Sequence, residues 1–226
     1  MGSGDRPAGL SPRRRAICEA ALDLAATGGN RAVTHHAVDA RLGIARGSTS
    51  YYYRTRQDLL EAAITRLTEA SREAFHIALD VPADGPEAPP RTNAPHRTEF
   101  LDHTAPLDRT DALTHAAGLI AGQLDRLLGD RRRDALARYA LVPDAVGNES
   151  LRAALAVCLF STPAAERLMD SLGSADSARA ARDLVSLLEG LLFDRLHGAR
   201  SLPGHGGDDL RPTVGLWLAA LSGRTR

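Results

Sequence analysis

The sequence predicts an all-α protein, because helical spacing of apolar residues recurs along the chain and strand patterns are nearly absent. Its 226 residues are enough to bury a large core without disulfides or structural metals. Aromatic residues make up only 4% of the chain, so we expect that core to consist mainly of aliphatic side chains and alanine. These observations together favour a helical protein with an aliphatic interior.

The amino-terminal part predicts three helices and the start of a long fourth one. Ser11 followed by Pro12 is typical of a helix start. Thr55 and Asp58 have the spacing of a capping box, which opens the long helix. The predicted helices of this part cover about residues 12–28, 34–43, 45–53 and 55–79.

The rest of the chain predicts further helices separated by two loops. Six prolines and glycines between Pro82 and Pro95 indicate a mobile loop over about 81–96, and a glycine-rich connector is expected at 198–207. The helices of this part are expected near 97–104, 109–129, 131–142, 149–161, 162–173, 176–197 and 208–222.

Charge is distributed unevenly along the chain, although the formal total is zero. Residues 1–56 hold nine arginines and four acidic residues, a net charge of +5, and the remainder carries −5. A basic end on an acidic body is the asymmetry expected when one end of a protein meets a polyanion.

The segment 34–53 predicts a helix-turn-helix, a motif whose second helix enters the major groove of DNA. That second helix offers one guanidinium, three hydroxyl side chains and three phenols, and it has no acidic residue. Such a polar helix would make a poor core element, but its side chains suit a groove that is lined by phosphates and base edges.

Residues 14–67 resemble the DNA-binding domain of the tetracycline-repressor (TetR) family. The matching pieces are Ala20-Ala21-Leu22-Asp23-Leu24, Gly28-Gly29, Val33-Thr34, Leu42-Gly43-Ile44, Arg46-Gly47-Ser48, Tyr51-Tyr52-Tyr53 and Thr55-Arg56-Gln57-Asp58-Leu59-Leu60. The resemblance implies a three-helix DNA-binding domain joined by a long helix to a helical ligand-binding and dimerisation domain. It divides the chain into a disordered arm (1–11), the DNA-binding domain (12–57) and the second domain (58–226).

The resemblance also implies which residues would contact DNA. These are Thr34, His36, Arg46, Gly47, Ser48, Ser50, Tyr51, Tyr52 and Arg56. Arg13 to Arg15 could reach the flanking backbone or the minor groove. Three positions depart from the family pattern. Thr49 stands where an aliphatic residue usually packs, which would anchor the helix less firmly. Ser50 replaces a common tyrosine, and Tyr53 replaces a usual phenylalanine and is expected in the core.

The resemblance places a small-molecule effector between helices of residues 96–175. Polar candidates for that site are His115, Gln123, Tyr139 and Cys158. A homodimer would use the two leucine-rich helices near 176–197 and 208–222. The candidate interface residues are Leu184, Leu188, Leu191, Val214, Trp217 and Leu221. The alternative, that these leucines belong to the monomer core, stays open.

These observations predict a homodimeric transcriptional repressor that an unknown small-molecule ligand releases from a palindromic operator in double-stranded DNA. No catalytic motif, metal-ligand spacing, cofactor motif or membrane span is found, so we expect a cytoplasmic, nucleoid-associated protein that is not an enzyme. Two alternatives remain: an all-α carrier or enzyme with a vestigial DNA-binding end, and an activator or corepressor-dependent regulator. Cys18 is expected as an inert buried thiol, and Arg131 to Arg133 as a solvated face.

Overall fold

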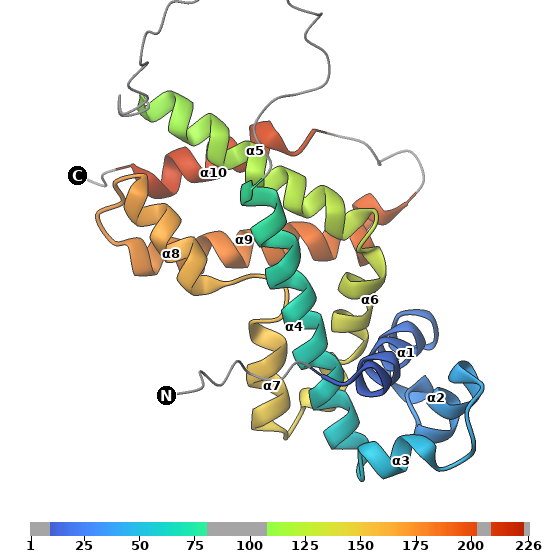
Figure 1. The fold of residues 1–226 in the computed structure, drawn as a ribbon. Coiled ribbons are helices and arrows are strands. Elements are labelled where there is room, and N and C mark those ends of the chain that lie inside the picture. Colours follow the sequence, from blue (N-terminus) through green and yellow to red (C-terminus); the bar gives the residue numbers. More distant parts are fainter. Residues whose placement is uncertain (1–9, 81–107, 203–208, 224–226) are drawn as a thin grey trace, which may run out of the picture.

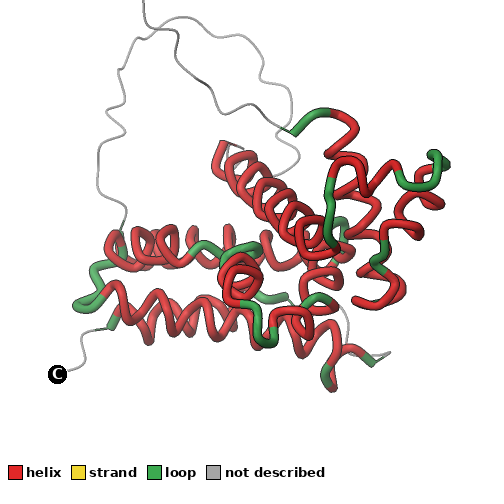
Figure 2. Tube along the Cα trace, turned by 90° about the horizontal axis from the view of Figure 1, so that it is seen from below, coloured by secondary structure: helices red, strands yellow, loops and turns green. Residues whose placement is uncertain are grey.

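The computed structural model describes residues 10–80, 108–202 and 209–223, and within them the all-α prediction is confirmed. Figure 2 shows helices and loops, and no strand, in this part of the chain. The helices are α1 (Pro12–Gly28), α2 (His35–Leu42), α3 (Ser48–Tyr52), α4 (Arg56–Asp80), α5 (Arg109–Leu128), α6 (Arg132–Ala140), α7 (Glu149–Ala156), α8 (Thr162–Ser171), α9 (Ser177–His197) and α10 (Arg211–Ser222), with short 3-10 turns η1 (Asn30–Ala32), η2 (Val142–Ala145) and η3 (Ala199–Ser201).

Local capping explains why the first helices begin where the sequence predicts. The Ser11 side chain caps α1 by accepting a hydrogen bond from the Arg14 N–H, and the Thr34 side chain caps α2 in the same way. At the start of α4, the Asp58 N–H donates to the Thr55 hydroxyl and the Thr55 N–H donates to the Asp58 carboxylate, both at 3.0 Å. The predicted capping box is therefore present.

Two predicted helices are longer than the observed ones. The helix predicted over 149–161 ends at Ala156, and Ser161 caps a separate helix, α8, in which Pro163 stands in the first turn. The helix predicted over 45–53 is reduced to α3. The predicted helix at 97–104, the loop at 81–96, residues 203–207 of the connector and most of the amino-terminal arm lie outside the described residues.

The described molecule consists of a head, α1 to α3, and a body formed by residues 108–202 and 209–223, with α4 running from the one toward the other (Figure 1). In the head, α1 packs against α2 and α4, and it also packs against α6 of the body. In the body, α8 packs on α9 and α10 packs on α5. The core is aliphatic as expected, with large buried side chains such as Ile17, Leu59, Leu124 and Leu184.

The six residues predicted at a dimer interface all pack against the core of the single chain. Leu184, Leu188, Leu191 and Val214 are buried within the single chain, and Trp217 and Leu221 pack against the same core. The apolar stripe of α9 is covered by α8, α5 and α10. The apolar stripe of α10 is covered by α5, α9 and α8. Other apolar side chains of these helices are exposed instead, namely Leu187, Phe193 and Leu216.

No helix among the described residues combines the length and the apolar character that a bilayer span requires.

Candidate DNA-binding site

Two glycines with positive φ shape the helix-turn-helix of α2 and α3. Gly43 ends α2 at a φ of 61°, and Gly47 precedes α3 at a φ of 89°. Residues with a side chain rarely adopt this left-handed conformation, so both corners of the turn depend on glycine. The Ser48 hydroxyl donates to the Ala45 carbonyl at 2.6 Å and closes the turn before α3.

A buried carboxylate holds α3 against α2. Asp39 of α2 is only 3% exposed, and it accepts three hydrogen bonds from the start of α3. Its Oδ2 accepts from the Gly47 N–H at 2.7 Å, and its Oδ1 accepts from the Thr49 N–H at 2.8 Å and from the Thr49 hydroxyl at 2.6 Å. Burial would raise the pKa of Asp39, but these hydrogen bonds outweigh burial and lower it. The site therefore holds an ionised carboxylate.

Behind α3, the side chain of Tyr53 closes the head core, as predicted. Tyr53 is buried, and its hydroxyl shares a hydrogen bond with the Cys18 thiol at 3.4 Å. Burial raises the pKa of that thiol, which fits the prediction of an inert cysteine. His35 of α2 donates from Nε2 to the Tyr53 carbonyl at 2.8 Å and so ties α2 to the end of α3.

The outer side of the motif carries polar and aromatic side chains. Tyr51 is 83% exposed, and its ring meets the Tyr52 ring edge-on at a centroid distance of 5.2 Å. Arg46 and His36 are exposed, and the Arg46 guanidinium donates to His36 Nε2 at 3.3 Å. This surface offers hydrogen-bond donors and acceptors and an aromatic edge, and Asp39, the one acidic residue of positions 24–57, is buried.

Eight of the nine predicted DNA-contact residues lie on α2 or α3, in the turn between them or at the N-cap of α2, at one end of the molecule (Figure 1). Ser50, like Tyr51, is exposed, Ser48 and Tyr52 are half-buried, and Thr34 is exposed at the α2 cap. These eight are Thr34, His36, Arg46, Gly47, Ser48, Ser50, Tyr51 and Tyr52.

Arg56 is placed differently from the prediction that it would clamp a phosphate. Its guanidinium donates to Asp144 of η2 through two nitrogens, at 2.5 and 3.2 Å. It also donates to the backbone carbonyls of Val33 at 3.0 Å and Asn30 at 2.7 Å. These four bonds use four of its five N–H donors, so Arg56 joins the start of α4 to η1 and to the body. The neighbouring Arg54 is exposed.

A second correction concerns Arg131 to Arg133, of which only Arg132 is a solvated residue. Arg133 of α6 pairs with Glu19 at 2.7 Å and Asp23 at 3.1 Å, both on α1, and with Asp134 at 2.7 Å. Glu19 also accepts from Arg66 of α4 at 2.9 Å, and Asp134 accepts from Arg131 at 2.9 Å. We call these six residues the head–body network, because they connect α1 of the head with α4 and with α6 of the body.

Of the four polar candidates for a ligand site, three form hydrogen bonds within the protein and one lies on the surface. His115 is exposed, and the Gln123 side chain accepts from Arg126 at 2.8 Å. The Tyr139 hydroxyl donates to the Glu189 carboxylate at 3.0 Å, and the buried Cys158 thiol donates to the Leu155 carbonyl at 3.3 Å.

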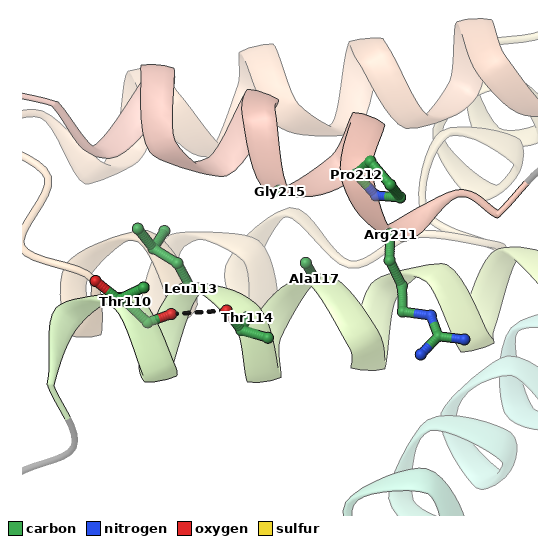
Figure 3. Close-up of a pocket in the computed structure, with 7 residues that line it drawn as sticks. All are labelled: Thr110, Leu113, Thr114, Ala117, Arg211, Pro212 and Gly215. Carbon is green, nitrogen blue, oxygen red and sulfur yellow. Dashed lines mark hydrogen bonds between the residues drawn. The ribbon is translucent and has the colours of Figure 1, made fainter.

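None of these four lines the hollow of about 370 Å³ that lies between α5 and α10 (Figure 3). Thr110, Leu113, Thr114 and Ala117 of α5 and Arg211, Pro212 and Gly215 of α10 line it.

Sequence reasoning missed the roles of Asp39 and Asp144. A signal for Asp39 was present, since it is the one acidic residue between positions 24 and 57. A lone carboxylate in a basic segment indicates a dedicated partner. Asp144 gave no such signal, because its partner Arg56 lies 88 positions away.

Comparison with known proteins identifies the chain. Residues 111–221 match the family described as tetracyclin repressor-like, C-terminal domain. The chain belongs to the TetR family. The family match lies in the body, whereas the resemblance read from the sequence lies in the head, so the two assignments rest on different residues. TetR proteins are transcriptional regulators, and this chain is one of them.

Solved structures share the fold over nearly the whole TetR chain. A TetR-family member from Streptomyces coelicolor A3 has a TM-score of 0.61 at 21% identity and covers 93% of this chain and 98% of its own. The multidrug binding protein EbrR, complexed with imidazole, has a TM-score of 0.60 at 22% identity, covering 96% and 98%. A transcriptional regulator from Saccharomonospora viridis, complexed with choline, has a TM-score of 0.61 at 18% identity, covering 93% and 95%. A comparison of the sequence with curated proteins gave no match.

Proposed function

We propose that this TetR-family regulator is a homodimeric repressor that reads a palindromic operator through α2 and α3 and leaves it when a small molecule binds. The observation that carries the proposal is the outer surface of α3. Together with the turn before it, this surface presents Arg46, Ser50 and Tyr51 to solvent, while Asp39, the one acidic residue of positions 24–57, is buried against the start of α3. A surface of this kind suits phosphates and base edges.

A dimer is needed because one helix-turn-helix reads only half a site. Two copies related by a two-fold axis would place their α3 helices one DNA turn or a multiple of it apart, about 34–36 Å per turn. The exposed apolar side chains of α9 and α10, which are Leu187, Phe193 and Leu216, are the surface that we propose for this contact.

A small-molecule effector is proposed because related folds hold one. EbrR is complexed with imidazole and the Saccharomonospora viridis regulator with choline. In this chain the hollow between α5 and α10 is the ligand site that we propose. A coupling of about 1–3 kcal/mol between the two sites would weaken operator binding about 5- to 150-fold.

Selection of bound sequences from random duplex DNA by the full chain tests the proposal. We expect a palindromic consensus, because a symmetric dimer presents two identical α3 helices. Arg46→Ala should then weaken binding to that consensus by about 1–3 kcal/mol, whereas Arg72→Ala, an exposed arginine of α4, should leave it unchanged. Recovery of no enriched sequence would refute DNA reading by this chain.

The sign of control is tested by titrating operator affinity with candidate small molecules. A repressor of the proposed type loses affinity as ligand is added. A gain of affinity would instead identify a regulator that needs its ligand to bind DNA.

A further inference from the structure

We propose that Asp39 is a positioning residue for DNA reading, which fixes α3 through a clip of three hydrogen bonds and never contacts DNA itself. The Asp39 clip consists of the Asp39 carboxylate, the Gly47 N–H, and the N–H and hydroxyl of Thr49. This inference rests on the proposed function and names the residue on which the orientation of its reading helix depends.

The first step of the argument is that α3 cannot hold its own position. It has five residues, far fewer than an isolated helix needs to be stable in water. Gly47 at its N-cap has no side chain with which to cap it, and Thr49 is its one fully buried residue. An aliphatic side chain at position 49 would anchor the helix by packing alone, but a threonine there must also satisfy its buried hydroxyl.

The second step is that Asp39, on the neighbouring helix α2, both caps the start of α3 and satisfies the buried Thr49 hydroxyl. Its Oδ1 satisfies the Thr49 hydroxyl and the Thr49 N–H together, at 2.6 and 2.8 Å. Its Oδ2 holds the Gly47 N–H at 2.7 Å, so the two oxygens grip the chain on both sides of Ser48. An ionised carboxylate makes stronger hydrogen bonds to such donors than a neutral group does.

The third step concerns the other end of α3. Tyr53, directly after α3, is buried against Cys18, and its carbonyl accepts from His35. With this end fixed, loss of the clip would free the amino-terminal end of α3 to tilt and rotate. The residues that would move are those proposed to touch DNA, Ser48, Ser50 and Tyr51, while Asp39 stays buried and out of reach of a duplex.

Four variants of the full chain test the inference. Asp39→Ala removes the clip, and Thr49→Val removes only the hydroxyl bond at nearly constant shape. The double variant D39A/T49L fills the vacated volume with an apolar side chain, so that packing replaces the clip. Asp130→Ala, at an exposed carboxylate, controls for the loss of one negative charge.

The first readout is affinity for the duplex that the unchanged chain selects and for a scrambled duplex of the same length. Asp39→Ala should lose at least about tenfold in affinity for the selected duplex and Thr49→Val about two- to tenfold, with little change for the scrambled duplex. The double variant should recover the preference, and Asp130→Ala should retain it. Equal losses on both duplexes, or no loss in Asp39→Ala, would overturn the positioning role.

The second readout needs no DNA, and it separates a failure of this inference from a failure of the proposed function. Amide hydrogen exchange of residues 47–53 should be faster in Asp39→Ala than in the unchanged chain, while α5 and α9 exchange as before. Unchanged exchange over 47–53 would refute the clip. If the unchanged chain selects no duplex but the exchange result holds, the clip stands and the DNA-reading proposal fails.

Discussion

Arg54 and Arg56 stand two positions apart at the start of α4, and the structure places them in different surroundings. Arg54 is exposed, whereas Arg56 donates four hydrogen bonds to Asp144, Val33 and Asn30. A phosphate contact releases counterions, so each one steepens the dependence of DNA affinity on salt. An arginine that is engaged within the protein makes no such contribution.

We therefore predict that Arg54→Gln reduces the slope of log affinity against log salt by roughly 0.9, the value for one phosphate contact. Arg56→Gln, the matched control, should leave the slope unchanged. Filter binding or fluorescence anisotropy over a series of salt concentrations measures both slopes. A flatter slope for Arg56→Gln would show that Arg56 leaves Asp144 when DNA binds.

Asp39 makes the stability of the chain depend on pH in a known direction. Its pKa is lowered in the folded protein, so the carboxylate stabilises the fold above its ordinary pKa and that contribution is lost as pH falls through the lowered value. Urea unfolding between pH 7 and 3 should show a steeper loss of unfolding free energy in the unchanged chain than in Asp39→Asn. Parallel curves would contradict this assignment.

At the scale of elements, α1 is held by charges as well as by apolar packing. Burial disfavours the charged form of Arg133, but hydrogen bonds and the charges of Glu19, Asp134 and Asp23 raise its pKa. Arg133 is therefore a permanent cation between α1 and α6. Removing it leaves these carboxylates only their remaining partners, Arg66 for Glu19, Arg131 for Asp134 and Arg41 for Asp23.

We predict that Arg133→Gln lowers the free energy of unfolding by about 1–3 kcal/mol, because it breaks partly buried ionic hydrogen bonds. Arg132→Gln, one position away and exposed, should cost less than about 0.5 kcal/mol. Urea denaturation followed by circular dichroism measures both values. Equal costs for the two variants would contradict the head–body network.

The element boundaries were predictable where the deciding interactions are local. Ser11, Thr34 and the pair Thr55 and Asp58 act within three residues, so the sequence shows them directly. The partners of a helix face are not local. The leucine stripe of α9 predicts a buried face correctly, but periodicity does not tell whether α8 or a second subunit buries it. For the same reason the pairing of Arg56 with Asp144 could not be predicted.

At the scale of the whole molecule, the proposed dimer depends on side chains that a single chain leaves exposed. Leu216 of α10 is 69% exposed, more than the other large apolar residues of α9 and α10. An exposed leucine that another subunit covers cannot be replaced by a charged residue without loss of association.

We predict that the unchanged chain sediments as a dimer and that Leu216→Glu shifts it toward monomer at the same concentration. Val146→Glu, in the loop between η2 and α7, controls for a new charge at an exposed apolar position and should leave the dimer intact. Analytical ultracentrifugation separates these outcomes. A dimer in Leu216→Glu would move the interface away from this part of α10.

The contact of α1 with α6 bears on any attempt to re-engineer this regulator. The predicted division at residue 57 would separate α1, which carries Glu19 and Asp23, from α6, which carries their ion-pair partner Arg133. In a chimaera that joins residues 1–80 to a foreign effector module, Glu19 and Asp23 would face a surface that lacks the arginine with which they pair here. Such a swap should therefore carry α6 with it, or install an arginine at the equivalent place in the recipient.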